Sequence, residues 1–339
     1  MRNLIGFTLI ICACITSIAC SYSSPFQYDF DGYTMGTSYN VKVVSTEKIQ
    51  EDILQNIHRA IEDALVLVDS SMSTFKPDSE LSYLNRFAID LPFVVSKDLL
   101  TVLLYSKKLY VDSKGMFDIT VAPLVNLWGF GTSGSTGRVP SAEKIHEIGA
   151  YVGSNHFSID HGQVVKHKPV QFDLSALAKG FAVDQVALSL DALGIDNYLL
   201  EVGGEIIAKG LSQRGDPWVI GIEAPDHEAR RAHTAVELNN ASMATSGDYR
   251  NFFEADGRHY SHTLDPTTSF PVEHQLASVS VVSNSCMAAD ALATTLMVLG
   301  DIDGFKYAED RSISAYFIYR NGDSFETKWT SSFQQYFSD

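Results

Sequence analysis

Apolar residues recur at helical spacing in several segments of the chain. From residue 51 to residue 68, isoleucine, leucine, valine and alanine return every three or four positions, with charged residues between them. This pattern predicts an amphipathic helix with one apolar face. Ser96 precedes a second periodic segment and is a good N-cap for it. The further predicted helices span residues 98–110, 141–148, 176–193 and 287–299.

Shorter apolar runs bounded by turn residues predict strands. The strands are expected at residues 41–44, 156–159, 164–172, 198–202, 205–208, 218–223, 235–238, 277–282, 314–319 and 325–327. Helices and antiparallel-looking strands are mixed without a regular βαβα alternation, which favours the α+β class. Neither a short-period repeat nor a low-complexity linker divides the chain. We therefore expect one compact body of mixed, largely antiparallel sheets and helices over residues 33–339.

The first residues have the features of an export signal. Arg2 precedes an apolar run at residues 4–19, which ends in Ser-Ile-Ala-Cys-Ser. The run is short for a membrane span, and small residues before a cysteine resemble a bacterial lipoprotein signal. We expect residues 1–19 to be a signal peptide, Cys20 to be lipidated and residues 20–32 to form a tether. An ordinary cleaved signal or an uncleaved anchor are the alternatives.

Composition narrows the classes of partner and chemistry. The 339 residues carry a formal net charge of −16, and the sequence contains nothing like a basic patch, which argues against nucleic acid as a partner. Three of the four cysteines lie in or at the end of the leader. Only Cys286 remains in the body, so an internal disulfide is excluded there. We expect Cys286 to be a buried small apolar residue.

One predicted helix carries candidate metal ligands. Asp290 and Thr294 lie four residues apart in MAADALATTLMVLG, so they share one helix face. A carboxylate and a hydroxyl are hard oxygen ligands of the kind that Mg2+ takes. The alternative is structural: a threonine bonded back to its own helix and an aspartate favoured by the helix dipole.

Two other stretches carry polar chemistry. DLSALAKG, at residues 173–180, runs from a strand into a helix, a junction that exposes backbone groups able to bind phosphate or a metal. Lys179 can pair with a diphosphate there, although a polar turn with a solvated lysine is the alternative. His262, in SHTLDP, can accept a proton near neutral pH, and the alternative is a structural histidine. Neither GxGxxG nor a Walker A motif is present.

The motifs, in their order along the chain, resemble the ApbE family, the FAD:protein FMN transferases. The resemblance covers residues 33–300. It rests on the three stretches above, extended to QFDLSALAKG at residues 171–180, and on EVGGEI at residues 201–206. Met-Gly-Thr at residues 35–37, MSTF at 72–75 and FDITVAPLVNLWGFG at 117–131 also match.

The resemblance implies a central flavin cleft and a role for individual residues. It implies that Mg2+ is held by Asp290, Thr294 and the main-chain carbonyl of Ala176, and that His262 is the general base. It also implies that the flavin nucleotide is bound by Met35, Phe75, Phe117, Asp118, Asp173, Lys179, Leu264 and Ala293.

The resemblance further implies an activity and a setting. A Thr or Ser hydroxyl of a partner protein would attack the diphosphate of FAD, so that FMN is left on a phosphoester and AMP is released. The implied acceptor is a flavoprotein of a membrane electron-transport complex, of the sodium-pumping or Rnf type. The implied location is the periplasmic face of a bacterial inner membrane. Two alternatives stay open: a pyrophosphatase that converts FAD into FMN and AMP, and a flavin-binding lipoprotein without turnover.

Overall fold

The structure is a computed structural model that describes residues 24–132, 134, 137–225, 231–249, 251–255, 257–322 and 324–337. Its α-helices are α1 (Glu51–Met72), α2 (Glu80–Arg86), α3 (Lys97–Asp112), α4 (Ala122–Leu127), α5 (Ala142–Gly149), α6 (Ala178–Ala192) and α7 (Cys286–Asp310). Short 3-10 helices lie at Ser154–His156 and Ser331–Tyr336. The predicted N-cap is confirmed, because the Ser96 side chain accepts a hydrogen bond from the backbone of Leu99.

An eight-stranded sheet runs through the molecule in the order β1-β2-β6-β7-β10-β15-β16-β17. Every neighbouring pair in it is antiparallel. Its strands are β1 (Phe26–Thr34), β2 (Thr37–Ser45), β6 (Tyr198–Val202), β7 (Glu205–Lys209), β10 (Ala241–Gly247), β15 (Leu276–Ser283), β16 (Ser314–Asn321) and β17 (Ser324–Trp329). The α+β class is therefore confirmed.

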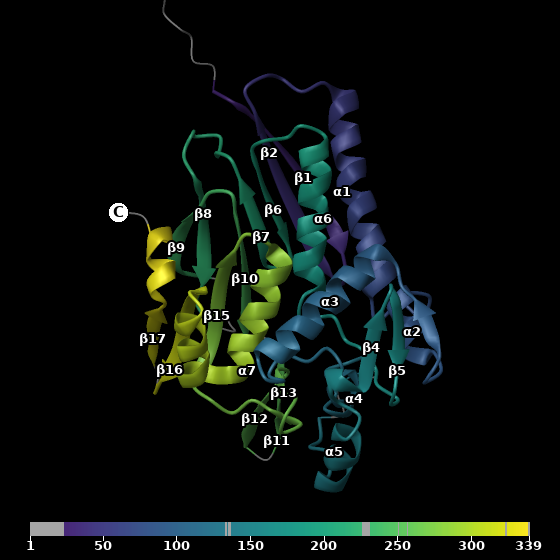
Figure 1. Cartoon of the computed structure of the whole chain (residues 1–339). Helices are drawn as coiled ribbons and strands as arrows, with labels where there is room; N and C mark the ends of the chain where they lie inside the picture. Colours follow the sequence, from purple (N-terminus) through teal and green to yellow (C-terminus); the bar gives the residue numbers. More distant parts are fainter. Residues whose placement is uncertain are drawn as a thin grey trace, which may run out of the picture.

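The sheet has one face covered by helices and another covered by a hairpin. Helices α1, α6 and α7 pack on one face (Figure 1). Along β16, Ala315 and Phe317 join the cluster beneath α7, whereas Tyr316 and Ile318 face the opposite cluster. This alternation is the period of two that a strand between two apolar layers requires. The opposite cluster is completed by the hairpin of β8 (Trp218–Glu223) and β9 (Ala232–Leu238).

Smaller elements border the main body on the side of α3 and α4. A three-stranded sheet has the order β3-β5-β4 and consists of β3 (Pro92–Val94), β4 (Phe157–Asp160) and β5 (Gln163–Lys166). The remaining pairs are β11 (Phe252–Ala255) with β12 (Arg258–Ser261), and β13 (Leu264–Asp265) with β14 (Phe270–Pro271). Buried Trp128 joins this region, because its indole N–H donates to the carbonyl of Ser269 at 3.0 Å.

Most predicted elements are present. The short elements α2, α4, β3 and β11–β14 were not predicted, and three further differences concern longer segments. The strands predicted at residues 156–159 and 164–172 form and pair as a hairpin. The second of them, β5, ends at Lys166 instead of residue 172, because Pro169 cannot donate to a ladder. The expected tether at residues 20–32 overlaps β1, which begins at Phe26 and forms the edge of the main sheet. The sequence pattern also missed β10, a central strand built largely from small residues.

Long α7 is two helical segments that meet at Gly300, whose φ of 81° lies in the left-handed region. This junction agrees with the end of the predicted helix at residue 299. The signal peptide and Cys20 lie outside the described residues. Among the residues that the structure describes, no helix combines the length and the apolar character needed to cross a membrane.

Candidate active site

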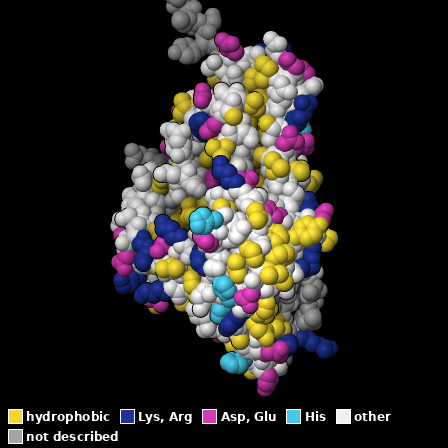
Figure 2. Space-filling view, turned by 45° about the vertical axis from the view of Figure 1, so that its right-hand side comes forward, with side chains coloured by type: hydrophobic (Ala, Val, Ile, Leu, Met, Phe, Trp, Pro, Cys, Tyr) yellow, Lys and Arg dark blue, Asp and Glu magenta, His cyan; other side chains and the backbone are white. Residues whose placement is uncertain are grey.

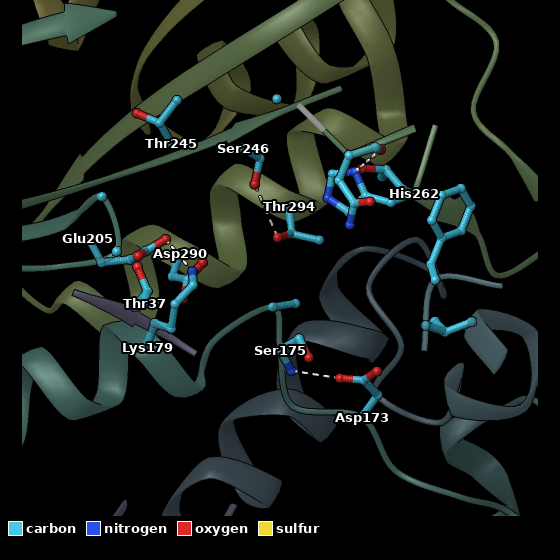
Figure 3. A pocket seen from close by; sticks show the side chains of 18 of the residues that line it. Thr37, Asp173, Ser175, Lys179, Glu205, Thr245, Ser246, His262, Asp290 and Thr294 are labelled. Carbon is cyan, nitrogen blue, oxygen red and sulfur yellow. Dashed lines mark hydrogen bonds and ion pairs between the residues drawn. The ribbon is translucent and has the colours of Figure 1, made fainter. Parts of the chain in front are cut away.

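A cleft of about 1150 Å³ opens beside the main sheet. Segments that are distant in the sequence line it, from the start of β2 through the residues before α6 to the first turns of α7. Figure 3 shows the polar side chains that converge there. On the face shown in Figure 2, Lys and Arg side chains are interspersed with Asp and Glu.

The first turns of α7 bring Asp290 and Thr294 to the wall of the cleft, as their spacing predicts. Asp290 is 4% exposed, and its Oδ2 accepts a hydrogen bond from the backbone N–H of Gly180 at 3.1 Å. The hydroxyls of Thr294 and Ser246 lie 3.2 Å apart (Figure 3). Burial raises the pKa of Asp290, while the nearby Lys179 and the Gly180 N–H lower it. A buried carboxylate in this setting favours a cationic neighbour.

Close contact between α6 and α7 makes this corner possible. A Cβ on Gly180 would lie 2.4 Å from the carbonyl oxygen of Cys286, so only glycine fits at this helix crossing. Asp184 of α6 also holds the start of α7. Its carboxylate accepts bonds from the Ser285 hydroxyl and from the backbone N–H groups of Cys286 and Met287, at 2.8 to 3.0 Å. Cys286 is buried, as expected from the sequence.

Lys179 projects from the first turn of α6 to the same corner. Its Nζ lies 2.5 Å from Oε1 of Glu205, the first residue of β7. Burial lowers the pKa of Lys179, but the carboxylates of Asp290 and Glu205 raise it to a larger extent, so the net shift is upward. The lysine is therefore charged, and it has an internal partner that the sequence did not predict.

The turn before α6 is held from two sides. Asn85 donates to the carbonyl of Phe172 at 2.9 Å and accepts from its N–H at 2.6 Å. Oδ1 of Asp173 accepts from the N–H of Ser175 at 2.8 Å, which turns the chain toward the helix. Asp173, Ser175 and Ala176 all line the cleft. The strand-to-helix junction predicted from the sequence is thus part of the site.

His262 follows β12 and lies on another side of the cleft (Figure 3). Its Nδ1 lies 2.9 Å from the carbonyl oxygen of Asn251. A carbonyl only accepts hydrogen bonds, so Nδ1 carries the proton and Nε2 is the basic nitrogen of the neutral ring. Burial lowers the pKa of His262, and the Asn251 carbonyl opposes that shift. The ring is therefore held in the tautomer that a base at Nε2 requires.

The side chains expected to bind flavin have different environments. Phe75 is 70% exposed and lines the cleft, so it is no core aromatic. Phe117 and Leu264 are buried in the wall. Asp118 is also buried, and its carboxylate accepts bonds from the backbone and hydroxyl of both Thr120 and Ser154. Its charge therefore serves to hold the loop after Phe117 in place.

The structure brings together ten of the residues singled out from the sequence. They are Phe75, Phe117, Asp118, Asp173, Ala176, Lys179, Leu264, His262, Asp290 and Thr294. Two others are not among the residues that line the cleft. Met35 has a φ of 48° in the two-residue turn between β1 and β2 and packs against the main core. Ala293 is fully buried on the inner face of α7.

Sequence reasoning assigned no individual role to three residues that shape the cleft: Asn85, Ser246 and Glu205. Asn85 and Ser246 give little signal, because polar residues of this kind are common on surfaces. The sequence does carry a signal for Glu205, because a carboxylate at the start of the apolar strand EIIA needs a partner. In the part of the chain that the structure describes, no group of three or more His, Cys, Asp or Glu side chains gathers as a metal cluster would.

Comparison with known proteins points to a single family. A sequence model described as the ApbE family matches residues 35–317. The FAD:protein FMN transferase of Vibrio cholerae is 42% identical over 92% of this chain and 93% of its own. That of Haemophilus influenzae is 39% identical over 99% and 98% of the two chains.

Solved structures agree with the sequence comparison. The flavin transferase ApbE from Vibrio cholerae superimposes with a TM-score of 0.85 at 40% identity, covering 92% of this chain and all of its own. The apo flavinyl transferase ApbE of Pseudomonas stutzeri gives a TM-score of 0.84 at 41% identity, over 92% and 97% of the two chains. The family match, the relatives and the shared fold together establish that this chain belongs to the ApbE family.

Proposed function

We propose that the protein is an FAD:protein FMN transferase that moves FMN from FAD to a Thr or Ser hydroxyl of a partner protein. The observation that carries the proposal is the single cleft that contains Asp290, Thr294 and Lys179 together with a histidine held in the basic tautomer. The names of the relatives support the flavin chemistry. The metal, the phosphoester and the release of AMP are what the resemblance to the family implies, and the side chains of the cleft fit them.

The oxygen atoms around Asp290 fit the ligand preference of Mg2+. They belong to the Asp290 carboxylate, the Thr294 hydroxyl and, in the turn before α6, the main chain of Ala176, all bordering one cleft. Thr294 can donate its proton to Ser246 and keep a lone pair for a metal. Mg2+ accepts few protein oxygens and completes its shell with substrate phosphates and water. When bound, the ion would supply charge stabilisation at the diphosphate.

In the proposed reaction, the acceptor oxygen attacks the phosphorus of the FMN half of FAD. The new bond is a phosphoester, and the bond between that phosphorus and the AMP oxygen breaks, so AMP leaves with the electron pair. His262 takes the hydroxyl proton at Nε2, since Nδ1 is engaged with Asn251. Lys179 uses one N–H on Glu205 and retains donors for the diphosphate.

The setting of the protein is also a proposal. Cys20, after the apolar leader, would carry a lipid that holds the protein at the periplasmic face of a bacterial inner membrane. An acceptor flavoprotein of a membrane electron-transport complex would then be within reach. Residue Phe26 already belongs to the folded sheet, so only a few residues separate Cys20 from the body of the protein.

The test is to mix the pure protein with FAD, Mg2+ and a candidate acceptor domain. Covalent flavin fluorescence on the denatured acceptor is the expected result, and it should be absent when the acceptor hydroxyl is removed by a Thr→Val change. Formation of FMN and AMP without labelled acceptor would identify a pyrophosphatase instead. FAD binding without turnover would identify a flavin-binding protein.

A further inference from the structure

Glu205 is a buried carboxylate that the reaction described above does not use. It is 3% exposed, and it lies in the wall of the cleft. Oε1 pairs with Lys179 at 2.5 Å, whereas Oε2 is buried without a hydrogen-bond partner among the described residues. Burying a carboxylate in this way is costly, so a compensating role near the cleft is expected.

Glu205 shares its cation with Asp290. In Figure 3 the side chains of Glu205, Lys179 and Asp290 converge on one point. Both carboxylates stabilise the ammonium, but its direct contact is with Glu205. Two carboxylates, Glu205 and Asp290, therefore share the ammonium of Lys179. Asp290, on α7, is the one without a direct ion pair to it.

The turn between β6 and β7 fixes this arrangement. Gly203 has a φ of 61°, and a Cβ there would lie 2.8 Å from the side chain of Thr37 and 3.3 Å from Cδ of Lys179. The bare backbone of the turn therefore packs against the stem of the lysine. Glu205 follows directly and pairs with Val202 in the hairpin. The EVGGE motif thereby holds both the stem and the charged end of Lys179.

We propose that Glu205 is a positioning residue that retains Lys179 as its own counter-ion and so leaves Asp290 free for a divalent cation. A lysine stem is flexible, and an ammonium without Glu205 has Asp290 as its remaining nearby carboxylate. The ammonium would then compete with Mg2+ for Asp290. This inference rests on the proposed function, because it assumes that Asp290 binds the metal.

The experiment measures Mg2+ binding without relying on transfer activity. Each protein is titrated with Mg2+ at a fixed low concentration of FAD, and the midpoint of thermal unfolding reports binding. Glu205→Gln should raise the Mg2+ concentration for half-maximal response about five- to tenfold, a coupling typical of interacting sites. Glu51→Gln removes an exposed carboxylate from α1 and should leave the response unchanged.

The double variant Glu205→Gln with Lys179→Met separates positioning from ligation. Lys179→Met alone is its reference, because that change removes the competing ammonium and the donor to the FAD diphosphate together. The double variant should give the same Mg2+ response as Lys179→Met, and transfer stays slow in both. A weaker response in the double variant than in Lys179→Met would mean that Glu205 supports the metal directly and would overturn the inference. If Glu205→Gln alone does not fold, the double variant, which leaves no unpaired buried charge from this ion pair, decides the question by the same criterion.

Two outcomes distinguish this inference from the proposed function. An unchanged Mg2+ response in folded Glu205→Gln, with a normal response in the wild type, overturns the role of Glu205 alone. A wild-type protein without any Mg2+ response overturns both the metal assignment and the inference built on it.

Discussion

At the scale of single residues, the cleft depends on a few side chains whose neighbours fix their charge and orientation. Asp290 is held by the Gly180 N–H, and Thr294 by Ser246. We expect Asp290→Ala to lower FMN transfer at least about 100-fold, because electrostatic groups of this kind commonly contribute several kcal/mol. Thr294→Val keeps the shape and removes one oxygen, so its loss should be smaller. The rate of acceptor flavinylation in Mg2+ measures both effects.

The adjacent Thr295 supplies a matched control. Its hydroxyl donates to the carbonyl of Ala291 within the helix at 2.8 Å, and the residue is fully buried. Thr295→Val should therefore retain near wild-type transfer. Folding of each variant is checked by circular dichroism. Asp290→Ala with wild-type flavinylation, other metals being excluded, would show that Asp290 is a packing residue of the helix.

His262 predicts a pH dependence. A base must be neutral, and burial places the pKa of His262 below its ordinary 6.5, so transfer should fall with decreasing pH only as the pH passes below that value. His262→Ala should slow transfer about 10²–10⁴-fold and remove this acidic limb, with FAD binding largely retained. The profile is measured as transfer rate against pH at saturating FAD.

His259 is the control for the histidine experiment. His259 lies on β12, three residues before His262, and its side chain is exposed. Its ring stacks on Phe252 with the ring centroids 4.2 Å apart. His259→Ala should leave the acidic limb in place. If His262→Ala retained the same limb, another group would be the base.

At the scale of elements, the crossing of α6 and α7 positions the metal corner. Gly180 lets the two helices approach, and its N–H is the donor to Asp290. Gly180→Ala should destabilise the fold by about 1–3 kcal/mol, because the added methyl group would overlap the backbone at Cys286. Urea denaturation measures this change. Replacing an exposed helical glycine with alanine would instead stabilise the fold by up to about 1 kcal/mol. Increased stability of Gly180→Ala would therefore contradict the close packing.

At the scale of the whole molecule, we expect the leader to decide where the cleft operates. We expect the mature protein to begin at Cys20 and to carry a lipid there. Mass spectrometry of the protein from its native host should find an acylated N-terminal cysteine, and Cys20→Ser should abolish the modification. Cys14→Ser should retain the lipid modification, because cleavage before Cys14, the rival site, would leave a signal with a very short apolar region. An unmodified N-terminus at Ser21 or later would contradict the lipid anchor.

Local patterns determined most elements of this protein. The apolar period of residues 51–68 predicted α1, and Ser96 predicted the start of α3. Helical spacing placed Asp290 and Thr294 on one face, and the order of motifs indicated the family. The helix predictions follow from the geometry of a helix and its cap, and the family follows from the resemblance of the motifs, so neither requires knowledge of distant contacts.

Only the tertiary structure decided what lies next to each reactive group. Lys179 and Glu205 are separated by 26 residues in sequence, and Gly180 and Asp290 by 110, yet each pair is in direct contact. The predicted tether includes the first residues of β1, whose pairing with β2 places them at the edge of the main sheet. β10 was missed because its small residues gain their burial from neighbouring strands. Burial and charge pairing are set by how segments pack in space, and a sequence pattern reports only the preferences within each segment.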